Sequence, residues 1–146
     1  MKYTDFVWDE ETGEAICSIQ DKQSKKIYIG IATCHPDDRD FMSEKTGCDI
    51  AFRRANIKFF QGLKEEQRIQ YKTLNHLYNT IKISKKFNPK SYETKMLLKS
   101  IKSIKFDLEV TKEMIEKEKE ELQRLIEEKD KFYKRTRARR ELAQYN

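Results

Sequence analysis

The sequence predicts an α+β fold, with a small N-terminal β-hairpin head and two long antiparallel α-helices that associate into an oligomer. Isoleucine-rich stretches with strand-like alternation occur in the first third of the chain. Beyond residue 49, apolar residues recur every three or four positions, which is helical spacing. The chain is 38% charged and 37% hydrophobic, so each helix buries only a stripe, and part of that stripe is expected to close against a partner chain.

The head is expected to be a hairpin. Residues 15–20 and 26–34 are predicted as two strands, and the turn-forming residues 21–24 separate them. A two-stranded hairpin alone is only marginally stable in water. One of its faces is therefore expected to rest on a helix, on Phe6 and Trp8, or on a partner subunit.

The chain is expected to divide into a head with its loop over residues 1–48 and a long helical hairpin over residues 49–146. Asp49 is the predicted N-cap of the first helix, because its carboxylate can accept hydrogen bonds from free backbone amides. The first helix is expected to end shortly before residues 84–91. Pro89 lies in that break, and proline is not tolerated inside a helix.

The second helix is expected to begin at Ser91 or Thr94 and to run nearly to the end of the sequence. Eight of eleven positions at alternating steps of four and three are apolar, which indicates a coiled-coil-like seam. Those positions are 97, 101, 104, 108, 111, 115, 118, 122, 125, 129 and 132. The polar entries Thr111, Glu118 and Lys129 argue against a simple parallel dimer. An antiparallel hairpin with the first helix, which then dimerises, fits as well.

The net charge of +6 is unevenly distributed along the chain. Residues 1–48 hold 6 Lys/Arg and 10 Asp/Glu, whereas residues 49–146 hold 25 and 15. The head is therefore acidic and the helical part is basic. A basic helical part favours anionic partners, which include nucleotides, nucleic acid and acidic protein surfaces.

The composition favours a cytoplasmic location without disulfides. No apolar run approaches the roughly 20 residues that a membrane span needs, and the first residues lack the apolar core of a signal peptide. We therefore expect no membrane association. Three cysteines, Cys17, Cys34 and Cys48, are an odd number, and a cytoplasmic location would keep them reduced.

Residues 35–38, His-Pro-Asp-Asp, resemble a strand-end signature of zinc-dependent N-acetylglucosamine deacetylases. That chemistry needs further metal-binding histidines, and His76 is the only other histidine, inside a predicted amphipathic helix. The alternative is that proline ends the strand and the aspartates organise the loop. Cys17, Cys34, His35 and Cys48 could in principle form a Cys3His zinc site. The cysteines are 17 and 14 residues apart, whereas zinc modules have close cysteine pairs, so the favoured alternative is that the thiols are buried as small apolar groups. We expect no metal or other cofactor and no enzymatic activity.

Residues 132–140 combine aromatic and cationic side chains, which is typical of nucleotide recognition. Arg135 and Arg139 are four positions apart and so share one face of a helix. Guanidinium groups bind phosphate through two parallel hydrogen bonds, and Phe132 or Tyr133 could stack on an adenine. The alternative is that these cations complement the helix dipole.

The loop between the helices has a similar character. Phe87, Asn88, Lys90 and Tyr92 supply two aromatic rings, an amide and a cation, and together they could contact a nucleotide. The alternative is an ordinary interhelical turn.

Two stretches of the sequence resemble a known protein family. Residues 30–38 read Gly-Ile-Ala-Thr-Cys-His-Pro-Asp-Asp, and residues 43–55 read Ser-Glu-Lys-Thr-Gly-Cys-Asp-Ile-Ala-Phe-Arg-Arg-Ala. Together they resemble the phage Thoeris anti-defence sponge family of the first described kind. The resemblance covers the head and the first turns of the helical part.

The resemblance implies a non-enzymatic sponge in the host cell cytoplasm. Such proteins bind a cyclic ADP-ribose signal made by bacterial TIR-domain enzymes and withhold it from its effector. They assemble as dimers or larger rings with ligand pockets at subunit junctions. The resemblance further implies a paired-arginine role for Arg135 and Arg139 and a stacking role for Phe132 or Tyr133, with residues 34–38 as scaffold. A cyclic oligonucleotide is a related ligand.

The charge distribution supports a second hypothesis of a different class. A basic helical protein could bind nucleic acid, or it could block a host defence complex that binds nucleic acid, through phosphate contacts that weaken with salt. Its acidic head is unfavourable for simple coating of DNA.

Overall fold

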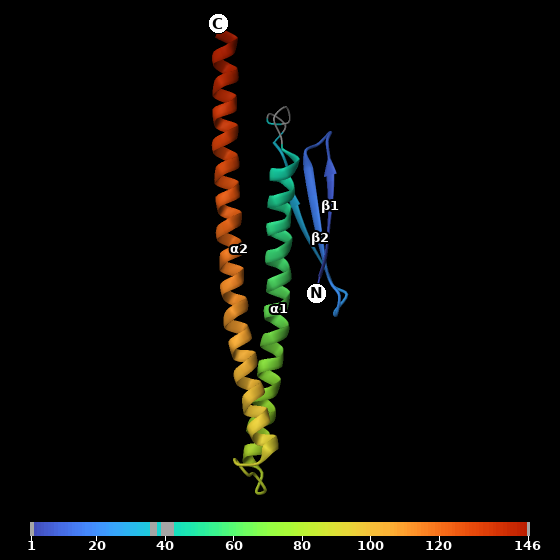
Figure 1. Ribbon diagram of the computed structural model, residues 1–146, viewed down its shortest axis with the longest axis vertical. Helices are drawn as coiled ribbons and strands as arrows, with labels where there is room; N and C mark the ends of the chain where they lie inside the picture. The colour runs from blue at the N-terminus through green and yellow to red at the C-terminus, as the bar shows by residue number, and fades with distance from the viewer. Residues whose placement is uncertain (1, 36–37, 39–42, 146) are drawn as a thin grey trace. The chain divides into compact units, whose positions relative to one another are not determined.

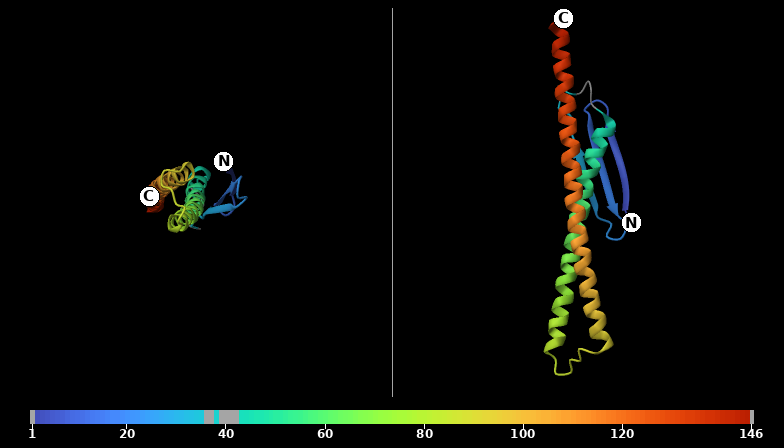
Figure 2. Two further views of the ribbon diagram at one scale, coloured as in Figure 1. Left: turned by 90° about the horizontal axis from the view of Figure 1, so that it is seen from below. Right: turned by 60° about the vertical axis from the view of Figure 1, so that its left-hand side comes forward.

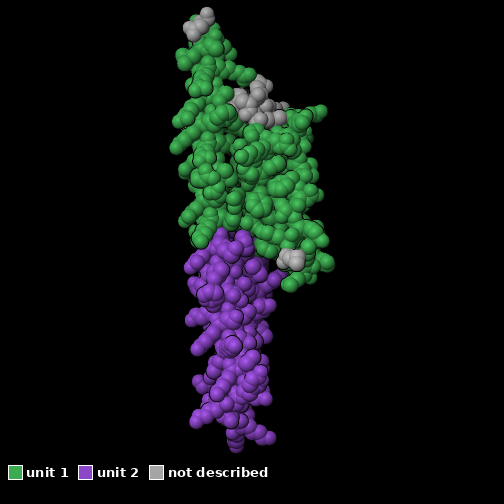
Figure 3. Space-filling view, viewed as in Figure 1, with its two compact units in different colours: residues 1–59, 116–146 green, residues 60–115 purple. Residues whose placement is uncertain are grey.

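The computed structural model describes residues 2–35, 38 and 43–145, and it has an α+β architecture (Figure 1). A sheet at the N-terminus precedes two long antiparallel helices, as predicted. The elements are β1 (Lys2–Asp9), β2 (Glu14–Asp21), β3 (Ile27–Ala32), α1 (Glu44–Ile83) and α2 (Tyr92–Tyr145). The chain forms two compact units, residues 1–59 with 116–146 (unit 1) and residues 60–115 (unit 2) (Figure 3).

The head is a three-stranded sheet, one strand more than the predicted hairpin. The predicted strands are confirmed as β2 and β3, and β1 pairs with the free side of β2 in the antiparallel order β1-β2-β3. Phe6 and Trp8 are therefore members of the sheet. Asp5 interrupts the apolar pattern of β1, which is an edge strand with one side open to solvent, and such a strand gives a weak sequence signal.

One face of the sheet packs on the first turns of α1 and forms the core (Figures 1 and 2). The buried residues that meet there are Ala15, Cys17, Ile19, Ala32, Ile50, Ala51 and Ala55. Gly30 allows the close approach, because a Cβ on it would lie 2.1 Å from the Ala51 carbonyl oxygen. The buried thiol of Cys17 has its pKa raised to about 11 by burial, so it packs as a small apolar group.

Two cations of α1 secure the outer edge of β3. Arg54 donates a hydrogen bond from Nη1 to the Ile31 carbonyl oxygen at 2.6 Å. One turn later, Lys58 donates from Nζ to the Ile29 carbonyl oxygen at 2.7 Å. Carbonyl groups at the edge of a sheet otherwise attract further strands, so these contacts also cover the edge.

The first helix begins six residues earlier than predicted, at Glu44 rather than Ile50. Ser43 is its N-cap: the hydroxyl accepts a hydrogen bond from the Thr46 amide at 3.3 Å, and the carbonyl accepts one from Gly47 at 2.9 Å. The prediction of Asp49 as the cap is wrong. Gly47 indicated a loop, yet it lies inside the helix, where a Cβ would come within 3.0 Å of the Trp8 ring.

The second helix begins as predicted. The Ser91 hydroxyl accepts a hydrogen bond from the Thr94 amide at 3.2 Å, and its carbonyl accepts one from the Lys95 amide at 3.1 Å. Ser91, rather than Thr94, is therefore the N-cap. No helix in the described part of the chain is both long and apolar enough to cross a membrane.

The predicted seam of α2 is buried in its middle and drifts off the buried face at its end. Leu108, Thr111 and Ile115 are buried, whereas Phe132 is 54% exposed and Tyr133 is only 8% exposed. A straight α-helix turns about 20° per heptad away from a seven-residue repeat. Over five heptads this drift is about 100°, the angle between neighbouring residues. The seam position therefore passes from Phe132 to Tyr133.

The polar positions of the seam have partners within the same chain. Thr111 donates its hydroxyl to the Asp107 carbonyl oxygen at 2.9 Å. Glu118 accepts two hydrogen bonds from Arg53 Nη1, at 2.9 and 3.0 Å. In unit 1, α2 thus packs on α1 of its own chain.

Candidate ligand-binding site

A pocket of about 500 Å³ lies in unit 1, where the segment after β3 meets the C-terminal part of α2. Its lining residues are Thr33, Cys34, His35, Asp38, Lys129, Asp130, Tyr133, Lys134 and Arg137. The volume is within the usual range for small-molecule sites, roughly 300–1,000 Å³. Two segments nearly 100 positions apart in the sequence therefore build one site.

An ion pair between the buried Asp38 carboxylate and the partly exposed Arg137 joins the two sides of the pocket. Arg137 donates from Nε to Oδ1 of Asp38 at 2.7 Å, and its Nη2 donates to the other carboxylate oxygen. The Asp38 side chain is only 4% exposed, so it leaves water almost completely and depends on this partner. The Asp38 amide also donates to the His35 carbonyl oxygen at 2.9 Å. The Asp38 carboxylate thus contacts α2, while Pro36 and Asp37, the other residues of the predicted loop, lie outside the described residues.

Tyr133 places a phenol in the pocket. Burial raises its pKa to about 12, and interaction with Cys34 acts in the same direction. The phenol therefore stays neutral far above physiological pH and can donate a hydrogen bond. Lys129 carries its Nζ over the ring, 6.0 Å from the ring centroid.

The charges around the pocket favour an anion on the α2 side. Lys129, Lys134 and Arg137 contribute three cations, and Arg137 is already engaged by Asp38. Asp130 is a further carboxylate in the lining. Lys134 makes no ion pair or hydrogen bond with any residue that the structure describes. It is therefore available to a phosphate.

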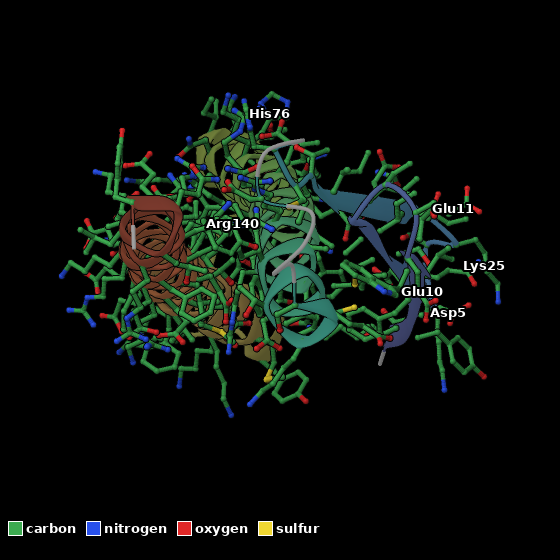
Figure 4. The ribbon with its side chains drawn as sticks, turned by 90° about the horizontal axis from the view of Figure 1, so that it is seen from above. Asp5, Glu10, Glu11, Lys25, His76 and Arg140 are labelled. Atoms are coloured by element: carbon green, nitrogen blue, oxygen red, sulfur yellow. The ribbon has the colours of Figure 1, made fainter. Side chains whose placement is uncertain are left out.

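The other predicted residues of α2 lie outside this pocket. Phe132, Arg135 and Arg139 are exposed, and none of them lines it. Figure 4 shows Arg140, by contrast, on the side of α2 that faces the rest of unit 1. The basic residues at the end of α2 therefore lie on two sides of the helix: some face the rest of unit 1, and others are exposed on the outer side.

The predicted loop residues fall in unit 2. Phe87 and Asn88 line a second hollow of about 410 Å³, together with Ile81, Ser84, Lys86, Ser91, Glu93 and Thr94. Asn88 accepts the Lys90 amide at 2.9 Å, and Phe87 meets the Tyr78 ring edge-on at 6.3 Å between centroids. Lys90 and Tyr92 do not line it. These contacts fit an ordinary interhelical turn.

Sequence reasoning missed most of the pocket. A spacing of four residues places Lys129, Tyr133 and Arg137 on one face of the helix. The sequence did not show that this face is the buried one, because the seam drifts by one residue along α2. Cys34 and His35 follow β3 directly and were expected to be scaffold. No signal in the sequence linked them to α2.

The described residues contain no group of three His, Cys, Asp or Glu side chains arranged to hold a metal ion. His76, considered above as a distant zinc ligand, is an exposed residue of α1 in unit 2. The Cys34 thiol lies 3.5 Å from the carbonyl oxygen of His35, its neighbour in the chain.

Searches of family models, of curated proteins and of solved structures found no match to this chain.

Proposed function

We propose that the protein binds a small phosphorylated nucleotide of the cyclic ADP-ribose type, or a cyclic oligonucleotide, and sequesters it without cleavage. The pocket beside Tyr133 carries this proposal, because it combines a suitable volume, a neutral phenol and the cations Lys129, Lys134 and Arg137. Ligand sites of this kind pair an apolar or aromatic surface with a few placed polar groups.

The pyrophosphate and the base of such a ligand are expected to contact different residues of the pocket. A pyrophosphate is expected to lie against Lys129 and Lys134, whose ammonium groups supply charge without fixed geometry. The base is expected to lie against the ring of Tyr133. Tight binding needs a preformed site, and the Asp38–Arg137 pair would hold the two walls in place before the ligand arrives.

The second stretch that resembles the sponge family builds the fold, whereas the first stretch also supplies Cys34, His35 and Asp38 to the lining of the pocket. Gly47, Ile50, Ala51 and Ala55 of the second quoted stretch contact the sheet or lie in the core. The resemblance therefore supports a shared scaffold, and the pocket supports the ligand class. Binding in the host cell cytoplasm, as an anti-defence protein, completes the proposal.

We also propose a homo-oligomer, because the sheet has an uncovered apolar face. Val7, Ile27, Ile29 and Ile31 are each between 44% and 60% exposed. Val7, Ile16 and Ile31 form one row across the three strands, so the patch is continuous. A contiguous apolar patch of this kind commonly marks a contact with another protein.

Isothermal titration calorimetry tests the ligand. Cyclic ADP-ribose isomers and cyclic di- and trinucleotides would be titrated into the intact protein and into Tyr133→Leu and Lys134→Ala. Loss of one charge-assisted contact is expected to weaken binding by about 10-fold or more. Lys117→Ala, an exposed cation of α2 outside the pocket, is the matched control and should bind as the original chain does. Equal losses in the control and the pocket variants would contradict the proposal.

A further inference from the structure

The segment of α2 from residue 129 to residue 140 has more cations than the pocket uses. It holds seven Lys/Arg and one Asp/Glu. Lys129 and Arg137 lie on the pocket side, whereas Lys131, Arg135 and Arg139 lie on the opposite side of the helix and are exposed. These three repeat every four residues, so they form one ridge with steps of about 6 Å along the helix axis.

Pairing within the chain does not explain this outer ridge. Most other arginines have carboxylate partners: Arg53 pairs with Glu118, Arg68 with Glu65, Arg124 with Glu121 and Glu128, and Arg137 with Asp38. Arg135 and Arg139, by contrast, make no ion pair or hydrogen bond among the described residues. Adjacent unpaired cations repel one another, so the arrangement costs stability unless an anion joins it.

The helix dipole does not explain the ridge either. Cations complement the dipole within about the last turn of a helix. The last turn of α2 contains no basic residue, and Arg135 lies ten positions before Tyr145. Neither arginine lies in that turn. The sequence alternative of dipole compensation is therefore a poor account of these two side chains.

An exposed aromatic ring stands beside the cations. Phe132 is 54% exposed and precedes Arg135 by three positions, so it borders the same side of the helix. Solvent exposure of a phenylalanine next to unpaired arginines is the combination that single-stranded nucleic-acid sites use, with phosphates on the cations and bases on the ring. A convex ridge cannot enclose a small nucleotide, but it can follow a strand.

We propose that the outer ridge of α2 (Lys131, Arg135 and Arg139, with Phe132) binds single-stranded nucleic acid. Successive phosphates lie on the three cations, and one base stacks on Phe132. Its three cations lie outside the lining of the pocket around Tyr133, whereas the Phe132 ring contacts the Tyr133 ring at 5.8 Å between centroids. The ridge gives the protein a second, sequence-tolerant anionic partner.

Fluorescence anisotropy with a labelled oligothymidine of about 20 nucleotides tests the proposal. Titrations would run between about 50 and 200 mM salt, with the full-length protein. The double variant Arg135→Ala/Arg139→Ala is expected to bind at least 10-fold more weakly. Its slope of log affinity against log salt should fall in magnitude by about 1.4, since each phosphate contact on a single strand contributes about 0.7.

Two further variants distinguish binding of nucleic acid at the ridge from nonspecific attraction to any exposed cation of α2. Phe132→Ala should weaken binding roughly 10-fold with an unchanged salt slope, because stacking releases no counterions. Lys95→Ala/Lys99→Ala removes two exposed cations of α2 at the same spacing and is the matched control. It should keep both affinity and slope.

Three results would overturn the proposal. The first is that the control pair loses as much oligothymidine affinity as Arg135→Ala/Arg139→Ala. The second is that duplex DNA binds as tightly as oligothymidine and Phe132→Ala has no effect. The third is that oligothymidine does not bind at about 50 mM salt. Capture of an acidic protein by the ridge, without oligothymidine binding, would also reject it. Small-nucleotide titrations of Arg135→Ala/Arg139→Ala separate this result from binding in the pocket. Neither arginine lines the pocket, so their loss should leave small-nucleotide affinity unchanged.

Discussion

Gly30 brings β3 into direct contact with the backbone of α1. Its partner across the sheet is Cys17, and its facing neighbours on the helix are Ala51 and Ala55. All four residues are small, which allows the sheet and the helix to approach closely. A glycine between isoleucines in a predicted strand is itself a signal of such an approach.

Gly30→Ala is expected to destabilise the fold by about 2–3 kcal/mol, because overpacking of a tight contact costs about that much. The added Cβ would lie 2.1 Å from the Ala51 carbonyl oxygen and 2.4 Å from the Ala55 nitrogen, both rigid backbone atoms. Urea unfolding measures the change. Ile31→Val, on the open face of the sheet, is the control and should stay within about 0.5 kcal/mol. A Gly30→Ala protein as stable as the control would refute the close contact.

Tyr133 should make stability fall at alkaline pH. Its pKa is about 12 in the folded chain, against an ordinary value of 10.0. Between these values the unfolded chain releases the phenol proton and the folded chain keeps it, so unfolding becomes more favourable as pH rises. The contribution is complete below pH 10 and is lost toward pH 12.

Urea midpoints at several pH values compare the original chain with Tyr133→Phe. The stability advantage of the original chain should shrink as pH rises through this window. Tyr145→Phe, at an 88% exposed position, should run parallel to the original chain. If Tyr133→Phe also runs parallel, the phenol is not buried as described.

The residues of the site were the hardest part to predict. Sequence spacing grouped Arg135 with Arg139, and it did so correctly, but it could not say which side of the helix faces inward. A drift of one residue over the seam places Tyr133 rather than Phe132 on the buried side. A short stretch of sequence does not show this drift, because it accumulates over the whole length of α2.

At the scale of elements, helix ends follow local hydrogen bonds. Ser91→Ala should destabilise unit 2 by about 1 kcal/mol, because the Thr94 amide loses its acceptor. The measurement is the urea midpoint of unfolding. Ser100→Ala, at an exposed interior position of α2, should be neutral or slightly stabilising, since alanine is the better helix former. The opposite order of the two variants would show that Ser91 is not the cap.

Elements with a regular apolar repeat could be predicted from the sequence, whereas elements whose repeat is interrupted by a polar residue or a glycine could not. Alternation over β2 and β3 and the long repeat of α2 identified those elements. β1 was missed because Asp5 interrupts its apolar pattern, and the start of α1 was misplaced because Gly47 indicated a loop. In that helix, contact with Trp8 outweighs the low helix propensity of glycine.

At the scale of the whole molecule, the sequence suggested a division after residue 48. The compact unit that contains the head also takes in residues 49–59 of α1 and residues 116–146 of α2. The sheet needs the helices to cover its inner face, because a small sheet alone cannot bury enough apolar surface. Such long-range cover is a tertiary property and leaves little trace in local composition.

The open face of the sheet leads to a prediction about assembly. Light scattering after size-exclusion chromatography should give a mass that is a multiple of the 17.6 kDa chain. Ile29→Lys places a charge in the centre of the apolar patch and should shift the protein toward the monomer. Lys26→Glu, in the neighbouring exposed turn, changes charge outside the patch and should not. A monomeric original chain would contradict the proposed oligomer.

The proposed function requires that the protein binds its nucleotide and releases it chemically unchanged. The most direct test incubates excess protein with a cyclic ADP-ribose isomer, filters off the free ligand, then denatures the protein and analyses the released material by chromatography. We expect the original chain to deplete the free ligand and Tyr133→Leu to leave it in solution. Denaturation of the original chain should then release all of the ligand intact. A cleaved product, or no depletion with any tested nucleotide, would show that the protein does not sequester such a ligand.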